Sequence, residues 1–433
     1  MNTQRTAPFL LRILFKSVTY GGITYAIAKV LSLVTKIIVA RVGIQDFGLY
    51  YFTTETTRML AAFAAFGIPM SVGRFLGFHQ SDKTQKTAIV SLAFIIIICL
   101  SILVSLLVLA ISPLIIRGTE YPDALDIFRI ALLNIIGGAL LLFAKGVAFG
   151  EINPKRAYQY ETGDIVCKFI FVLLGLYFIA PTAKGAVIGY TAAALLWGIM
   201  VSLHASHPLH FTYIGTLRAR IVSFAWPVGL SEILTAITGT AMLTFLSRSM
   251  GLEAVSAYGI GVSVATLLFF IPQASLPVLL PLLSNRYARG TLTQRDISQV
   301  YRFIWLPTLA LAITLLVMSP GLIPYVFQAQ PDFNLMPTMI LLVAYAWYAC
   351  IVWISRQVID MTGRTKINLL ITCIRVVFVV NIGIYGILKA GPTGLAIAVL
   401  LGWIAEGMVS FFVSRSVVTK ISAAQSGILK QPN

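Results

Sequence analysis

Basic side chains stand inside apolar segments of this chain, where they could bind an anion. Lys29 and Lys36 are seven residues apart in the first apolar run. In a helix they would lie on one face, roughly 10 Å apart along the axis. In the second run Glu55 and Arg58 are three residues apart and can pair locally. A charge at mid-bilayer costs about 2.5–3.5 kcal/mol on insertion scales and normally faces a bundle interior or a wet cavity. We therefore expect Lys29, Lys36 and Arg58 to face such a cavity.

Other charged residues also fall inside the apolar runs. They are Lys145, Asp164 and Lys168 in the first half of the chain and Glu232, Arg375 and Glu406 in the second. The first half therefore has a surplus of positive charge, and the second half has a slight surplus of negative charge. Because guanidinium and ammonium groups suit phosphate oxygens, this asymmetry predicts a cargo that carries phosphate. The alternative is that neighbouring carboxylates neutralise the cations, which then serve packing.

Two of these groups have a structural alternative of their own. Asp164 and Lys168 are four residues apart, so we expect them to satisfy each other. Lys145 is nearer the cytoplasmic end of its run, where it can either snorkel to the interface or join the anion-binding cations. We include Lys145 with Lys29, Lys36 and Arg58 in the predicted substrate-binding set.

Three carboxylates are candidates for coupling cargo movement to an ion gradient. Glu232 follows Pro227, which removes a backbone hydrogen bond and can kink its helix. A carboxylate beside a bendable helix suits proton coupling, whereas capping or pairing is the structural alternative. Glu406 has the same two interpretations, and Glu55 completes the set.

The composition is that of a polytopic helical membrane protein. The chain has 433 residues, of which 58% are hydrophobic and 11% charged, whereas soluble domains carry about 25% charged residues. A bilayer span needs about 20 mostly apolar residues, and such runs follow one another here. We predict an all-α fold with twelve spans, at roughly 19–42, 46–72, 87–116, 126–149, 160–181, 184–205, 219–248, 253–284, 301–327, 334–358, 367–388 and 392–415.

Several other classes of function are disfavoured. The net charge of +17 comes mainly from short loops, so it has a topological explanation and does not predict a nucleic-acid partner. His204, His207 and His210 surround Pro208 in the central loop, so we predict no metal site there. Nucleotide-binding and hydrolase signatures are absent from the sequence, and we expect neither a cofactor nor enzymatic activity.

The chain reads as two halves with the same topology. A constant offset places Gly43 on Gly251, Ile44 on Leu252, Tyr50 on Tyr258 and Pro69 on Pro277. Lys and Arg concentrate in alternate loops, which predicts that both termini are cytoplasmic. Halves with an even number of spans are related by an axis along the membrane normal. We expect a six-helix lobe over 1–205, a cytoplasmic linker over 206–220, and a second lobe with a short tail over 221–433.

The segments ARVGIQDFGLYYF and FGIPMSVGRFLGFHQSDK resemble the first hairpin of Wzx-type polysaccharide-biosynthesis flippases. FAWPVGLSEIL and the stretch from Gly251 to Tyr258 are similar to the seventh and eighth helices of that family, which is part of the multidrug/oligosaccharidyl-lipid/polysaccharide (MOP) exporter superfamily. The resemblance implies two six-helix lobes around a central V-shaped cavity, with alternating access. By position, it implies that Lys29, Lys36 and Arg58 are pyrophosphate ligands. Twelve spans argue against the lipid-II branch, which has two more.

The leading hypothesis is a flippase of the inner membrane. Its cargo would be an oligosaccharide linked to undecaprenyl or another polyprenyl pyrophosphate, such as an O-antigen, capsule or exopolysaccharide repeat unit, and its partners would include the polysaccharide polymerase and export machinery. A multidrug or organic-cation antiporter of the same superfamily is the alternative, although that function predicts a carboxylate-rich first lobe. A membrane glycan polymerase or ligase is less favoured because the longest outer connection, near Arg117–Asp126, is short.

Overall fold

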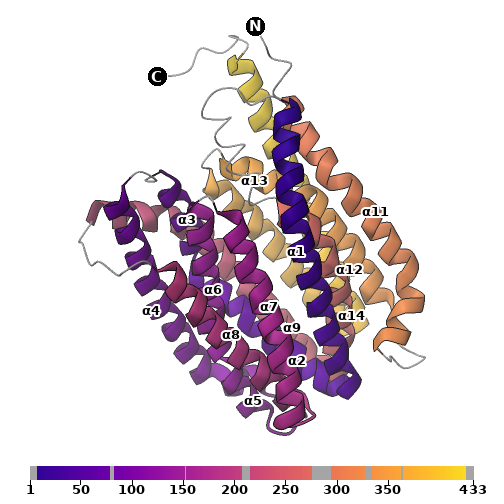
Figure 1. Cartoon of the computed structure of the whole chain (residues 1–433). Helices are drawn as coiled ribbons and strands as arrows, with labels where there is room; N and C mark the ends of the chain where they lie inside the picture. The colour runs from indigo at the N-terminus through magenta and orange to yellow at the C-terminus, as the bar shows by residue number, and fades with distance from the viewer. Residues whose placement is uncertain are drawn as a thin grey trace.

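The regular structure of the chain is helical throughout the described residues (Figure 1). The computed structural model describes residues 7–78, 82–151, 153–206, 215–275, 294–327, 334–361 and 364–425. The first half contains α1 (Ala7–Val42), α2 (Ile44–Ala65), α3 (Ile68–Phe78), α4 (Lys83–Ile116), α5 (Ala124–Ala131), α6 (Leu133–Gly150), α7 (Pro154–Phe178) and α8 (Ala183–Ala205). The second half contains α9 (Gly215–Ala265), the 3₁₀ turn Thr266–Phe269, α11 (Gln294–Phe327), α12 (Met336–Trp347), the π turn Tyr348–Val352, α13 (Trp353–Met361) and α14 (Thr365–Gln425).

Two of these helices are too long to be single spans. The 51 residues of α9 are interrupted at Gly251 (φ +77°), and the 61 residues of α14 are interrupted at Gly391 (φ +55°). In α14, a Cβ on Gly394 would lie 1.9 Å from the Gly386 carbonyl oxygen. Residues on either side of Gly391 therefore lie side by side, and α14 is a hairpin of two helices.

Contacts with α2 show the same reversal in α9. A Cβ on Gly48 would meet Leu252, and one on Gly259 would meet the Tyr51 ring. Farther along α2, Met59 contacts Gly239 and Phe66 contacts Gly229. The part of α9 before Gly251 therefore runs antiparallel to α2, and the part after it runs parallel.

Membrane-spanning segments agree with the predicted architecture. Within the described ranges, eight helices are long and apolar enough to cross a bilayer, or nine if α2 and α3 form one bent span. Counting α9 and α14 as two spans each, and adding the more polar α7, gives the predicted twelve. Of the predicted linker, residues 215–220 already belong to α9, while 207–214 lie outside the described residues.

The second predicted span is broken, where we expected one helix over 46–72. Helices α2 and α3 meet at 47°. Phe66 (φ +47°) and Gly67 (φ +67°) both adopt left-handed conformations between them. A Cβ on Gly67 would lie 2.7 Å from the Ala225 carbonyl oxygen. Glycine is therefore required both for the conformation and for the close packing of this bend against α9.

Asp46 joins two interhelical connections to the start of α2. Its Oδ1 accepts hydrogen bonds from Tyr121 Oη (2.5 Å) and from the Ala183 backbone N–H (2.6 Å). Burial and the Asp46 carboxylate together raise the pKa of Tyr121 to about 12. The hydroxyl therefore stays protonated and keeps donating, which holds the α4–α5 and α7–α8 connections against α2.

Residues that correspond to each other in the two halves of the chain meet at the end of the molecule opposite the start of α1. Gln45 donates a 3.4 Å hydrogen bond to Glu253, which is its partner 208 residues later. Ser256 donates to the Ile44 carbonyl at 2.5 Å. Ser256 corresponds to Gly48, and Ile44 corresponds to Leu252. The first turns of α2 and of its repeat therefore cross at a pseudo-twofold axis, as in an isologous contact. We call this contact the pseudo-axis seam.

The helices are arranged around α2 and α9. In Figure 1, α3, α4, α6 and α8 lie on one side and α11, α12 and α14 on the other. Helix α9 packs against both α2 and α14, and α1 packs against α7 and α11. The start of α1 and the end of α14 lie at the same end of the molecule (Figure 1).

Candidate functional site

The charged residues of the first half gather where α1, α2, α6 and α7 face one another. Charges that act on Lys29 come from Lys36 on its own helix, Arg58 on α2, Lys145 on α6 and Glu161 on α7. Residues from four helices therefore form one electrostatic group, although they span more than 130 positions of the sequence.

Arg58 is paired but remains accessible. Its Nε donates to Glu55 Oε2 at 3.0 Å, and a second contact joins the same two side chains. The Arg58 side chain is nevertheless 60% exposed, although α2 is surrounded by α1, α4, α5, α6, α8 and α9. Its charge also interacts with Tyr190 of α8 and Tyr345 of α12. Arg58 is therefore exposed at a place where residues of both halves, Tyr190 and Tyr345, come within reach of its charge.

Lys29 and Lys36 have no carboxylate partner among the residues that the structure describes. Both are half-buried on α1. The Lys36 Nζ lies 5.7 Å from the centroid of the Tyr51 ring, within the range of a cation–π contact. An aromatic face compensates a buried ammonium only in part. These two lysines, together with the accessible edge of Arg58, form what we call the cation site.

Lys145 differs from the expectation for a free ligand because Glu161 of α7 pairs with it. The two side chains are 17% and 24% exposed. Sequence analysis omitted Glu161, since the predicted span began at 160. Helix α7 in fact starts at Pro154, and the Asn153 side chain caps it by accepting from Arg156 N at 3.2 Å. This Asn-Pro start was visible in the sequence and places Glu161 two turns inside the helix.

Asp164 and Lys168 form the local pair expected from their spacing. Their side chains meet at 2.6 Å, and Lys168 Nζ also lies 4.6 Å from the Tyr190 ring centroid. With Asp164, Glu161 and Glu55 all paired, the surplus positive charge among the membrane-embedded residues described in the first half is carried by Lys29 and Lys36.

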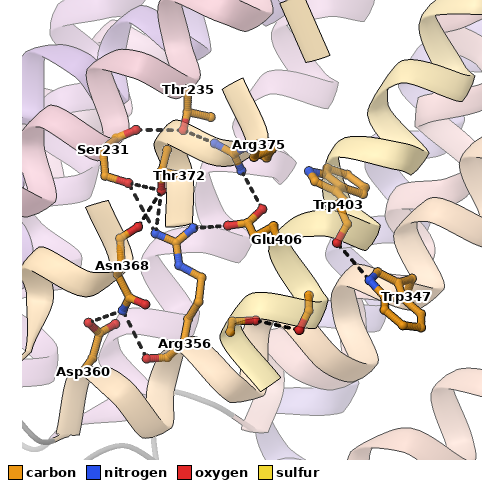
Figure 2. Close-up of polar contacts among 12 residues, drawn as sticks. Ser231, Thr235, Trp347, Arg356, Asp360, Asn368, Thr372, Arg375, Trp403 and Glu406 are labelled. Carbon is orange, nitrogen blue, oxygen red and sulfur yellow. Dashed lines mark hydrogen bonds and ion pairs between the residues drawn. The ribbon is translucent and has the colours of Figure 1, made fainter. Parts of the chain in front are cut away.

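A second polar cluster lies in the second half, between α9, α13 and α14 (Figure 2). Glu406 is completely buried and accepts from Arg356 at 2.8 Å and from Arg375 at 3.3 Å. Arg356 Nη2 also donates to Ser231 (3.3 Å) and Thr372 (3.2 Å). We call this cluster the arginine–glutamate network.

Sequence analysis did not include Arg356 among the membrane-embedded charges. It belongs to α13, and its side chain is only 19% exposed. Its position after a π turn has no simple sequence signal. The spacing between Arg356 and Glu406 also gives none, because α13 and α14 are brought together only by the fold.

The three coupling candidates have different surroundings. Glu55 and Glu406 are engaged in ion pairs. Glu232 instead accepts a 3.0 Å hydrogen bond from the backbone N–H of Gly67, in the α2–α3 bend. Glu232 thus connects the second half to the hinge-like break of the first, and the Arg356 charge acts on it from α13.

Of the three histidines of the central loop, the structure describes His204. His204 closes α8, and its ring contacts Tyr160 edge-on at 6.2 Å. His207 and His210 lie outside the described residues. No group of three or more His, Cys, Asp or Glu in the ranges given above could hold a metal ion.

The fold and the helix count define the class of protein: a multi-pass membrane protein with the fold of MOP-superfamily transporters. An inward-facing multidrug-resistance MATE transporter has a TM-score of 0.71 at 15% identity, over 91% of this chain and 95% of that one. A Vibrio cholerae MATE transporter has a TM-score of 0.72 at 16% identity, over 96% and 99% of the two chains. A MOP transporter from Pyrococcus furiosus has a TM-score of 0.71 at 14% identity, over 94% and 96%.

A match between the sequence and a protein-family model identifies the family. The model described as "Polysaccharide biosynthesis protein" matches residues 14–287, well over half of the chain, and the chain belongs to that family. No curated protein matches the sequence.

Proposed function

We propose that the protein is a flippase that moves a polyprenyl-pyrophosphate-linked oligosaccharide from the cytoplasmic to the outer leaflet of the inner membrane. The observation that carries this proposal is the cation site: Lys29 and Lys36 lack carboxylate partners among the described residues, and Arg58 beside them is 60% exposed. Unpaired cations held within a membrane protein are costly unless an anion visits them. Membership of the polysaccharide biosynthesis family supports a glycan-bearing cargo.

The geometry suits a pyrophosphate. Two lysines about two turns apart on α1 can each meet one phosphate as a point charge, while the planar Arg58 guanidinium offers a fork to two oxygens. Glu55 holds Arg58 in place until the phosphates compete for it. The headgroup would bind between the halves beside Arg58, and the polyprenyl tail would remain in lipid.

Transport would proceed by alternating access between two lobes, 1–205 and 221–433, with both termini cytoplasmic. A pyrophosphate moving outward gains free energy at a negative-inside potential, about 2.3 kcal/mol per charge per 100 mV. We place the polysaccharide polymerase and export machinery downstream of this step, because the flipped glycan must be consumed on the outer face.

A multidrug antiporter is disfavoured by the same electrostatics. An organic cation needs an unpaired carboxylate, but each membrane-embedded carboxylate in the described first half is paired with a cation. The Pyrococcus furiosus structure is described as having a binding pocket of reverse polarity that suggests a different function. The same reasoning supports an anionic cargo here.

The test is complementation of a strain that lacks the transporter. Lys29→Ala, Lys36→Ala and Arg58→Ala should insert normally but reduce surface glycan at least tenfold, since a charged hydrogen bond contributes about 1.5–3 kcal/mol. Lys184→Ala is the matched control, because Lys184 is 45% exposed and pairs only loosely with Asp123 at 3.5 Å. Normal export by all three variants contradicts the site, and ethidium efflux without a glycan phenotype favours the antiporter.

A further inference from the structure

A cluster of aromatic rings lies in the second half of the molecule. Its members come from the 3₁₀ turn, α12, the π turn, α13 and α14: Phe269, Tyr345, Tyr348, Trp353 and Trp403. Phe269 and Tyr345 stack with centroids 4.7 Å apart, and Trp403 lies 4.9 Å from Tyr345 and 4.7 Å from Tyr348. The centroid of the Trp353 ring lies 5.1 Å from that of Phe269. We call these residues the aromatic cluster.

The cluster faces the cation site. The charges of Glu55 and Arg58, on α2 of the first half, both act on the Tyr345 hydroxyl. All five rings are half-buried, neither sealed in the core nor fully exposed as lipid-facing side chains commonly are. Tyr345 therefore lies near Arg58 but belongs to the opposite half of the molecule.

Polar atoms at the edge of the cluster have no partner. In the described part of the chain, the Tyr345 hydroxyl and the indole N–H groups of Trp353 and Trp403 form no hydrogen bond, and all three are open to solvent. Other tryptophans differ: Trp197 donates to the Tyr160 carbonyl at 2.8 Å, and Trp347 donates to the Trp403 carbonyl at 2.9 Å. Because these three donors are open to solvent, a ligand that enters beside the rings can accept hydrogen bonds from them.

The backbone holds the cluster in place. A π turn over Tyr348–Val352 closes a wider loop than an α-helical turn, so Trp353, five residues after Tyr348, returns to nearly the same side. Just beyond it, the arginine–glutamate network joins α13 to α14 through Arg356 and Glu406 (Figure 2). The Arg356 charge also acts on Tyr348. The rings are therefore positioned before any ligand binds.

We propose that the aromatic cluster is the sugar-binding subsite of the cargo, an inference that rests on the proposed function. A pyranose ring has an apolar C–H face, which can stack on an aromatic ring, and a hydroxyl edge, which can accept from the Tyr345 and Trp donors. The pyrophosphate at Lys29, Lys36 and Arg58 would place the first sugars against Tyr345.

Two other occupants fit less well. An organic cation could bind the rings by cation–π contact, but the nearest carboxylates, Glu55 and Glu406, are already paired, and Arg58 and Arg356 would repel it. A polyprenyl tail would leave the three polar donors without partners, which is unfavourable in a dry site. A neutral or anionic glycan is not repelled by Arg58 and Arg356, and its hydroxyl groups can accept hydrogen bonds from the three donors.

The test compares two lipids on purified full-length protein in nanodiscs. One is undecaprenyl pyrophosphate without sugar, and the other is the lipid-linked glycan that accumulates in cells lacking the transporter. The variants are Trp353→Leu and Trp403→Leu, with Trp403→Phe keeping the ring but losing the donor. Trp305→Leu is the matched control, since Trp305 lies on α11 and is 49% exposed.

The wild type should bind the glycan-bearing lipid about tenfold more tightly than the sugar-free lipid. Trp353→Leu and Trp403→Leu should lose that gain while binding undecaprenyl pyrophosphate normally, Trp403→Phe should lose part of it, and Trp305→Leu should lose none. Equal affinity of the wild type for both lipids, or an equal loss of both in the variants, overturns the subsite alone. Wild-type protein that binds neither lipid overturns the proposed function as well.

Discussion

Lys29 and Lys36 differ from the other membrane-embedded cations of the first half in what surrounds them. Arg58, Lys145 and Lys168 each contact a carboxylate, whereas the two lysines of α1 contact none in the described residues. A paired cation is already compensated in the resting protein, so it adds little attraction for a ligand. We therefore propose that anion binding is concentrated on α1, with Arg58 as the group that can exchange its partner.

Lys145 provides a test of this distinction. Removing one member of its pair leaves the other charge uncompensated, so Lys145→Met or Glu161→Gln alone should destabilise the protein by about 3–5 kcal/mol. The double variant removes both charges and should restore most of the stability and of glycan export. Thermal unfolding in detergent and surface-glycan assays measure the two effects.

If the double variant is stable yet exports as poorly as Lys29→Ala, Lys145 itself contacts the cargo. Asp164→Asn with Lys168→Met provides a comparison, because that pair shares the same helix and lies 2.6 Å apart.

At the scale of elements, the apolar runs predict the helices well and their breaks less well. The sixth span was expected at 184–205 and is observed at Ala183–Ala205, because its ends coincide with abrupt changes in polarity. The helix break at Phe66–Gly67 was not predicted, because it depends on packing against Ala225 and Gly229 from the other half. Local sequence shows a glycine there but not the neighbour that requires it.

The candidate site follows the same rule. The spacing of Lys29 and Lys36 on one helix, and of Glu55 and Arg58 on the next, could be read directly from the sequence. Pairing between helices could not, so Glu161 and Arg356 were both left out of the candidate site. The aromatic cluster also depends on a π turn, which has no reliable signature in a single sequence.

The pseudo-axis seam predicts a specific role for Gly48. A Cβ at this position would lie 2.3 Å from the Leu252 carbonyl oxygen and 2.7 Å from Ser256 Oγ. Gly48→Ala should therefore force the two repeats apart and lower the free energy of unfolding by about 1–3 kcal/mol. Unfolding by heat or denaturant in detergent measures the change.

Gly321 is the matched control in α11, because a Cβ there has no neighbour within 4 Å. Gly321→Ala should be neutral or stabilising by up to about 1 kcal/mol, through the gain in helix propensity. Equal effects of the two substitutions would show that the seam does not depend on close approach at Gly48.

At the scale of the whole molecule, the seam lies where the two halves must separate if the cargo leaves on the side opposite the termini. Gln45 and Glu253 mark it by a direct 3.4 Å contact between repeat mates. Arg41 and Phe47 extend it toward α11 through the Val326 carbonyl at 3.2 Å and the Phe327 ring at 6.4 Å. Gln45 and Glu253 are exposed, whereas Phe47 and Phe327 are buried, so parting the halves here would separate buried rings as well as a surface contact.

A short cross-link across the seam should therefore stop transport without unfolding the protein. In a background in which Cys99, Cys167, Cys350 and Cys373 are replaced by serine or alanine, Gln45→Cys and Glu253→Cys can be joined by a short bis-methanethiosulfonate reagent. Cross-linked protein should keep its affinity for undecaprenyl pyrophosphate, because Lys29, Lys36 and Arg58 are untouched. It should lose glycan flipping in proteoliposomes, and reduction of the cross-link should restore flipping.

Continued flipping by fully cross-linked protein would mean that the halves do not part at this axis. Each single-cysteine protein, treated with the same reagent, is the control that separates the effect of the cross-link from that of chemical modification.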